Sequence, residues 1–238
     1  MSRQLLERPA VDIEIWSDIA CPWCYIGKRR FEAALAQFAH RDEVRVSWRS
    51  FELDPSAPRE REGDRTARLA QKYGMTIEQA RAAERQITDT AAGEGIEFHL
   101  RDARSGSTFD GHRIIHLAAE HGLQDAMKER LLLAYFSEGE LIGDHETLVR
   151  LAVEVGLSED DVRATLAGDR FADAVRADEV TAQRFGISAV PTFVVDRSIG
   201  VSGAHPPDQL LLLLERGWEN QAPASIIAGG EACGPDGC

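Results

Sequence analysis

Four residues, Cys21-Pro22-Trp23-Cys24, lie where one hydrophobic period ends and another begins. Apolar and acidic residues alternate over 11–16, which predicts a β-strand. Over 27–40 the apolar residues recur three and four positions apart, which predicts a helix with one buried face. The sequence therefore places Cys21 at the N-terminus of a helix that directly follows a strand.

That position predicts redox chemistry for the two cysteines. Free backbone N–H groups and the helix dipole stabilise a thiolate, so we expect the pKa of Cys21 to lie below that of a free thiol. Two intervening residues keep the sulfur of Cys24 close enough to form a disulfide or to resolve a mixed one. Cys21 is predicted to attack and Cys24 to resolve.

A structural zinc site is the alternative interpretation of C-x-x-C spacing, and it needs four ligands. The other cysteines, Cys233 and Cys238, are spaced C-x4-C at the C-terminal end of the sequence, and the Cys21–Cys24 pair lacks the glycine-containing turn of a zinc knuckle. The strand-then-helix context favours redox chemistry. We predict no metal.

Composition narrows the class of partner. The 238 residues are 43% apolar, enough for a substantial core, and 27 basic against 40 acidic residues give a net charge of −13 without a basic stripe. This balance argues against nucleic acid and membrane as partners. Residues 1–9 carry no export signal and no later segment is long and apolar enough to span a membrane, so we expect a cytoplasmic protein.

The remaining periodicity predicts an α/β protein with a large helical insertion. A second strand is expected over 43–51 and two more around 190–195 and 199–201. Helices are expected over 65–73, 76–92, 108–121, 124–138, 145–155, 158–166, 171–185 and 207–218. We therefore expect residues 1–60 and 186–219 to form one discontinuous domain, 61–185 a helical insertion, and 220–238 a flexible tail.

Pro191 opens an apolar strand-like run, a position where proline is tolerated only at a strand start, edge or bulge. It either starts the strand or forms a cis bond after Val190. In a dithiol protein we expect the cis bond, which leaves the backbone of Val190 free to pair with a bound peptide beside the thiols.

Three polar or aromatic residues are candidates for the surroundings of the thiols. Asp18, three residues before Cys21, either tunes thiol proton affinity or caps the turn, and capping is the commoner role. Phe109 and His112 begin a predicted helix of the insertion and are expected to face the cleft over the thiols, although a lone histidine is more often a partly buried polar residue.

The C-terminal segment Cys233-Gly234-Pro235-Asp236-Gly237-Cys238 contains a turn signal that brings its two cysteines towards disulfide range. Three interpretations stay open: a second redox pair that exchanges with Cys21 and Cys24, a passive thiol pair, or metal binding.

Several motifs resemble the FrnE-type branch of the DsbA-like oxidoreductases, over nearly the whole chain. They comprise residues 17–28 around Cys-Pro-Trp-Cys, Arg49 to Leu53, Thr108 to Arg113, Val190 to Phe193 and Val201 to Ala204. The resemblance implies a thioredoxin fold interrupted by a helical domain, with Cys21 as nucleophile, Cys24 as resolving thiol and Pro191 as a cis-proline facing them. It also implies thiol–disulfide exchange with proteins or small thiols, no bound cofactor, and glutathione or thioredoxin as electron donor.

Two departures qualify the resemblance. Ile15 stands where thioredoxin-like enzymes often carry a buried acid, so proton transfer to Cys24 must use another group, with Asp18 the nearest candidate. The missing export signal favours a cytosolic reductase, isomerase or stress-responsive thiol exchanger, as a monomer or homodimer.

Two other functions remain. Glutathione-dependent 2-hydroxychromene-2-carboxylate isomerases and kappa-class glutathione transferases share this architecture but typically carry serine at the first catalytic position, whereas both Cys21 and Cys24 are present here. A redox-linked holdase chaperone that uses the helical insertion as an apolar platform leaves the cysteine placement unexplained.

Overall fold

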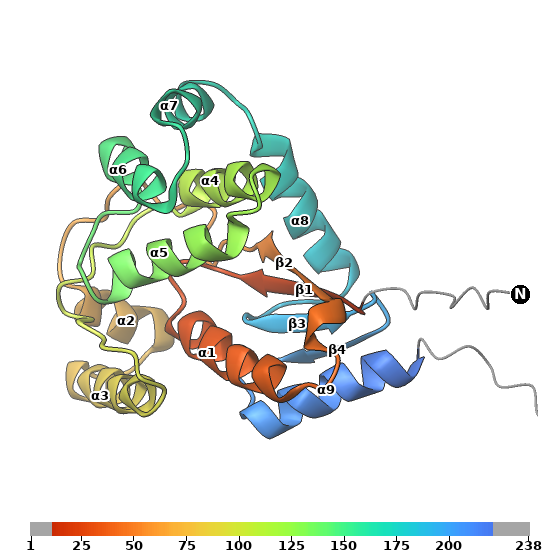
Figure 1. The fold of residues 1–238 in the computed structure, drawn as a ribbon. Coiled ribbons are helices and arrows are strands. Elements are labelled where there is room, and N and C mark those ends of the chain that lie inside the picture. Colours follow the sequence, from red (N-terminus) through yellow and green to blue (C-terminus); the bar gives the residue numbers. More distant parts are fainter. Residues whose placement is uncertain (1–10, 221–238) are drawn as a thin grey trace, which may run out of the picture.

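The computed structural model describes residues 11–220, which build one four-stranded sheet with helices around it (Figure 1). The strand order is β2-β1-β3-β4. The strands are β1 (Val11–Ser17), β2 (Val44–Ser50), β3 (Thr192–Val195) and β4 (Ile199–Ser202). All four were predicted, although β3 starts at Thr192, after Pro191, which cannot donate to a strand ladder.

The central strand β1 determines how the chain is connected. It pairs in parallel with β2 and antiparallel with β3, so Ile15 lies between Trp48 and Phe193. A parallel pair needs a crossover, which α1 (Pro22–Gln37) and the short 3₁₀ helix Arg41–Glu43 supply. β4 then pairs antiparallel with β3 at the sheet edge. This α/β arrangement is the thioredoxin fold expected from the sequence.

Both faces of β1 are covered. Figure 1 shows α1 and α9 (Pro207–Asn220) next to each other along one face. On the other face Trp16 donates a hydrogen bond of 3.0 Å to the carbonyl oxygen of Asp178 in α8 (Ala172–Arg184). Glu14, on the Trp16 side, is buried and paired with Arg49 and Arg197. Glu14 therefore does not mark a solvent face, whereas Asp12 near the start of the strand is exposed.

The helical insertion follows the predicted periodicity closely. Its other helices are α2 (Arg65–Tyr73), α3 (Ile77–Gly93), α4 (Phe109–Glu120), α5 (Gln124–Phe136), α6 (His145–Val155) and α7 (Glu159–Ala167). Thr76 and Gln79 form a capping box at the start of α3, and Ser158 accepts a hydrogen bond from the Asp161 N–H at the start of α7. Gly156 ends α6 with a φ of 106°, which favours glycine over residues with a side chain.

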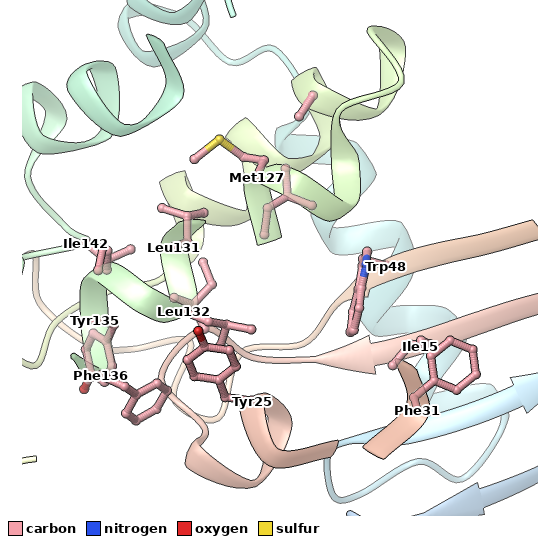
Figure 2. Packing of buried hydrophobic residues seen from close by; sticks show 14 of the residues in the cluster. Ile15, Tyr25, Phe31, Trp48, Met127, Leu131, Leu132, Tyr135, Phe136 and Ile142 are labelled. Atoms are coloured by element: carbon pink, nitrogen blue, oxygen red, sulfur yellow. The ribbon is translucent and has the colours of Figure 1, made fainter. Parts of the chain in front are cut away.

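One hydrophobic core runs from the sheet into the insertion. In Figure 2, Tyr25 of α1 points towards Leu132 and Phe136 of α5, while Ile15 and Phe31 meet beside the sheet. The Tyr25 hydroxyl donates a hydrogen bond of 2.7 Å to Glu129, also on α5. The first turn of the helix that carries the cysteines is therefore anchored in the insertion.

Candidate active site

The two cysteines occupy the junction predicted for them. Cys21 is the residue immediately before α1, with an extended backbone, and Pro22 is the first helical residue. The N–H of Cys24 donates a hydrogen bond of 3.0 Å to the carbonyl of Cys21. Both cysteines are free thiols, and no acidic residue lies in the first turn of α1. No side chain of the first turn of α1 therefore compensates the positive end of the helix dipole.

The two thiols differ in access and in their neighbours. Cys21 is 5% exposed and Cys24 is 0% exposed, whereas Trp23 between them is 40% exposed. The sulfur of Cys21 lies 3.6 Å from the carbonyl oxygen of Val190. The bond between Val190 and Pro191 is cis, as predicted. The contact between Cys21 and Val190 places this segment beside the more exposed thiol.

Gly27 lets α1 approach Pro191 closely. A Cβ at residue 27 would lie 2.8 Å from Cγ of Pro191 and 3.5 Å from the ring of Phe193. The one-turn spacing from Trp23 and Cys24 puts this contact directly behind the dithiol. The absence of a side chain at residue 27 therefore positions Pro191 against the helix that carries Cys21.

The prediction that the pKa of Cys21 lies below that of a free thiol is wrong for the substrate-free dithiol. The hydrogen bond to Cys24, followed by burial, raises the pKa of Cys21 well above that of an ordinary thiol. Burial also acts to raise the pKa of Cys24, but the hydrogen bond from Cys21 and the charge of Lys128 outweigh it and lower that pKa. The physical reason is that two adjacent thiols hold one negative charge between them, and Lys128 favours placing it on Cys24.

Lys128 of α5 is the functional candidate that sequence reasoning missed. Its side chain is buried, and the ammonium group donates a hydrogen bond of 3.3 Å to the carbonyl of Ser17, the last residue of β1. Burial lowers its pKa to about 8, although Cys24, Asp18 and Cys21 act in the opposite direction. A cation buried behind the dithiol supplies what a buried acid at residue 15 would not: attraction for a thiolate.

A signal for Lys128 was present in the sequence. Residues three, four and seven positions after it are Leu131, Leu132 and Tyr135, so the lysine interrupts the apolar stripe of its own helix. A lysine on a buried helical face needs a partner or a function.

Asp18 lies in the same buried cluster and caps the turn that precedes α1. Its carboxylate accepts hydrogen bonds from the N–H of Ala20 at 3.3 Å and of Leu53 at 2.8 Å. Burial acts to raise the pKa of Asp18, but His112 and the Leu53 N–H outweigh it, and the pKa falls below its usual value. Asp18 is therefore a buried anion close to the dithiol.

His112 is buried against Asp18, whereas Phe109 has other neighbours, and a place for His112 in the cleft stays a prediction. The imidazole of His112 is buried, with Nε2 3.4 Å from the Asp18 carboxylate. Burial lowers the pKa of His112 despite Asp18, so the neutral ring acts as a hydrogen-bond donor. Phe109 is half-buried, and the guanidinium of Arg176 lies 4.4 Å from its ring centroid. A role for Phe109 in the substrate cleft stays a prediction.

Glu52 is a second buried acid near the site, and unlike Asp18 it was not a candidate from the sequence. It is buried, pairs with Arg176 at 2.6 Å and leaves one carboxylate oxygen without a hydrogen-bond partner. Burial, with additional repulsion from Glu179 and Asp18, raises its pKa to about 7 despite Arg176. This side of the site therefore holds an acid that titrates near neutral pH.

Three further predictions concern the tail cysteines, a metal site and membrane-spanning helices, and the structure bears on them only within residues 11–220. Cys233 and Cys238 lie outside residues 11–220. Within those residues, no group of three His, Cys, Asp or Glu side chains is close enough to hold a metal ion. None of the helices formed between residues 11 and 220 is both long and apolar enough to cross a membrane.

Comparisons with known proteins agree with this geometry. The profile of the DSBA-like thioredoxin domain matches residues 12–215. A probable DsbA oxidoreductase from Streptomyces coelicolor is 48% identical, with a TM-score of 0.86 over 96% of this chain and 98% of that chain.

Two more distant structures share the fold. One is the cytosolic disulfide reductase DsbM from Pseudomonas aeruginosa, at 18% identity and a TM-score of 0.61 over 88% of this chain and 99% of that chain. DsbM is also known with GSH bound. The other is 2-hydroxychromene-2-carboxylate isomerase, at 13% identity and a TM-score of 0.63 over 88% of this chain and 95% of that chain.

Proposed function

Because the chain belongs to the family of DSBA-like thioredoxin domains, we propose that it catalyses thiol–disulfide exchange through Cys21 and Cys24. One observation carries this proposal: a partly accessible thiol at a helix N-terminus lies 3.6 Å from the Val190 carbonyl, with a second thiol buried behind it. That arrangement lets a disulfide approach one sulfur while the other waits to resolve the intermediate. Protein disulfides and small disulfides are both candidate substrates.

The hydrogen bond between the thiols suggests how the nucleophile forms. As Cys21 attacks, its proton moves to the Cys24 thiolate, and the new bond joins the Cys21 sulfur to one sulfur of the substrate. The substrate's own S–S bond breaks, and its other sulfur leaves as a thiolate. Cys24 then loses its proton and attacks the Cys21 sulfur, which forms the intramolecular disulfide and releases the second substrate thiolate.

We assign Lys128 to the resolving step. With a pKa of about 8, a fraction of Lys128 is neutral at physiological pH and can accept the proton of Cys24. Once charged, the ammonium stabilises the Cys24 thiolate. Asp18, the candidate from sequence, raises the pKa of Cys21 by repulsion, whereas the charge of Lys128 lowers the pKa of Cys24, so Lys128 is the better partner for this step.

Insulin reduction by dithiothreitol tests the proposal. We expect the full chain to accelerate it, Cys21→Ser to abolish the effect, and Cys24→Ser to trap a mixed disulfide that mass spectrometry detects. Equal activity in Cys21→Ser contradicts the dithiol mechanism. Glutathione-dependent turnover of an aromatic substrate that survives Cys24→Ser would instead support the isomerase or transferase alternative.

The finer assignments belong to the same proposal. Membership of the FrnE-type branch, a cytoplasmic location, and electron exchange between Cys21, Cys24 and a Cys233–Cys238 disulfide rest on the sequence motifs. If Cys233→Ser with Cys238→Ser leaves the turnover and potential of the Cys21–Cys24 pair unchanged, the tail pair is passive.

A further inference from the structure

A cavity of about 600 Å³ opens beside the dithiol, at the ends of β1 and β2. Asp18 and Ala20 line it on the side of β1, Leu53 and Asp54 on the side of β2, and α2 on the side of the insertion. Ala20 is bonded directly to Cys21, the more exposed of the two thiols, although neither cysteine itself lines the cavity. Its volume lies in the range of small-molecule sites.

The lining of the cavity is basic although the protein is acidic. Four cations line it, Arg61, Arg65, Arg68 and Lys72, against the carboxylates Asp18 and Asp54. The chain as a whole has a net charge of −13. A local reversal of sign inside a concave site indicates an anionic ligand.

Two of these cations are already neutralised by the protein itself. Arg61 pairs with Asp54. Arg65 pairs with Glu84 at 2.6 Å, and both side chains are largely buried. These two arginines therefore organise the wall of the cavity rather than wait for a ligand.

Arg68 and Lys72 differ from the other two. Arg68 donates hydrogen bonds only to backbone, at 2.8 Å to Glu62 and 2.7 Å to Gly63, and within residues 11–220 it has no carboxylate partner. Lys72 is exposed, and its ammonium lies 5.7 Å from the ring centroid of Tyr73. They are one turn apart on α2, so one ligand can reach both.

We propose that this cavity selects small acidic thiols and disulfides, whose carboxylates bind Arg68 and Lys72 while their sulfur meets Cys21. The proposal rests on the thiol-exchange function proposed above and names its substrate class. Carboxylates fit guanidinium and ammonium groups, and the pairing is favourable where the site is partly closed. Asp18 does not oppose it strongly, because His112 and the Leu53 N–H hold its charge.

The chemistry balances with a single acidic disulfide. Cys21 forms a mixed disulfide with one half of the ligand, and the other half leaves as a thiolate. Cys24 then displaces the bound half. The protein dithiol loses two electrons, the ligand disulfide gains them, and two acidic thiols are released.

A charge series of disulfides tests the proposal on the reduced full chain. The probes are glutathione disulfide, which is acidic, 2-hydroxyethyl disulfide, which is neutral, and cystamine, which is cationic. Oxidation of Cys21 and Cys24 is followed by acid quench, alkylation of the remaining thiols and mass spectrometry of the peptide. The measured quantity is the ratio of two rate constants for oxidation of the protein, that with glutathione disulfide over that with 2-hydroxyethyl disulfide.

We expect Arg68→Gln with Lys72→Gln to lower this ratio about tenfold, the size expected for the loss of two partly exposed ion pairs. In the unsubstituted protein the ratio should fall as salt is added, because salt screens exposed charges. The cationic disulfide should react more slowly than the neutral one, and the double substitution should reduce that difference.

Arg81→Gln with Arg85→Gln is the matched control, since both arginines are exposed on α3 and the net charge changes by the same amount. An equal fall in the ratio for this control, or no fall for the α2 pair, overturns the acidic-substrate proposal while thiol exchange stands. If none of the three disulfides oxidises the unsubstituted protein, the acidic-substrate proposal fails, and insulin reduction decides separately whether thiol exchange stands. Circular dichroism of each variant establishes that it is folded.

Discussion

The ammonium group of Lys128 donates a hydrogen bond of 3.3 Å to the carbonyl oxygen of Ser17, which ends β1. The helical insertion thereby places a buried cation near a dithiol that belongs to the start of α1. The charge of Lys128 helps to lower the pKa of Cys24, although the hydrogen bond from Cys21 has the larger effect. The insertion is thus part of the electrostatic environment of the thiols.

Replacement of this cation tests that relationship. Lys128→Met removes an attraction that exists only when Cys24 is ionised, so the reduced form loses stability relative to the oxidised form. We expect a reduction potential more negative by about 30 mV, which corresponds to about 1.4 kcal/mol. Equilibration with glutathione or dithiothreitol buffers measures the potential.

Lys28→Met is the control for Lys128→Met. Lys28 is equally buried, but Glu32, Asp125 and Glu129 neutralise it within the protein. This substitution should lower the free energy of unfolding and leave the potential within about 10 mV, a small fraction of a tenfold change in equilibrium constant. An equal change of potential in both variants would contradict a specific role for Lys128.

A second prediction concerns stability as a function of pH. The pKa of Glu52 is raised from 4.5 to about 7, so between these values the folded state binds more protons than the unfolded state. The contribution of Glu52 to stability should therefore fall as pH rises from 4.5 to 7, by on the order of 2 kcal/mol, while the lowered pKa of the buried His112 acts in the opposite direction. Glu52→Gln should remove this fall.

Urea denaturation across that pH range measures the effect of Glu52→Gln. Glu146→Gln is a suitable control because Glu146 is an exposed carboxylate whose pKa is lowered by Arg163. The control should retain the fall in stability. A pH profile unchanged by Glu52→Gln would show that Glu52 does not hold its proton in the folded state.

The spacing of apolar residues predicted the helices and strands of this fold, because each of them buries one face and the residues of that face lie close together in the sequence. The capping box at Thr76 and Gln79 placed the start of α3 within one residue. The placement of Cys21 before α1 followed from the same reasoning. These features depend on neighbours in sequence, which a single chain displays.

The charges of the site could not be predicted in the same way. Lys128 and Cys24 are 104 residues apart in sequence, and their interaction exists only after α5 packs over β1. The prediction that the pKa of Cys21 is lowered was wrong for this reason. It used only the position of Cys21 at the helix N-terminus, which is local, whereas burial and the interactions of the two thiols with each other and with Lys128 depend on the folded structure. Glu52 gave no signal because its burial depends on α8.

A third prediction concerns the close approach of α1 to Pro191. In Gly27→Ala the new methyl group would lie 2.8 Å from Pro191 Cγ, which forces the two apart. Alanine favours helix by up to about 1 kcal/mol, but overpacking costs about 1 to 3 kcal/mol. We expect lower stability together with slower thiol exchange.

Gly217→Ala provides the comparison for Gly27→Ala. Its methyl group would collide with Val195, where α9 packs on the sheet away from the thiols. Urea denaturation should show a similar loss of stability, while insulin reduction per folded molecule stays normal. If both variants exchange thiols at the same rate, contact with Pro191 does not position the site.

A fourth prediction concerns the buried anion Asp18. Its negative charge contributes to the raised pKa of Cys21, behind the larger effects of Cys24 and burial. Asp18→Asn retains an acceptor for the Leu53 N–H and removes the charge, so the pKa of Cys21 should fall. The iodoacetamide reaction rate as a function of pH reports the change.

Asp54→Asn is the control for Asp18→Asn, because Asp54 lines the same cavity but is neutralised by Arg61. It should leave the alkylation profile of Cys21 in place. A profile that shifts to higher pH in Asp18→Asn would mean that Asp18 stabilises the thiolate through its hydrogen bonds rather than opposing it by charge.

Tyr25, the residue directly after the dithiol motif, is buried among side chains of α5 and hydrogen-bonded to Glu129. A shortened chain without the insertion would leave this ring and Trp48 facing water, a large apolar surface of the kind that promotes aggregation. The smallest stable version of this protein therefore includes the insertion. Removing it would require redesign of the buried face of α1, the helix that carries the dithiol.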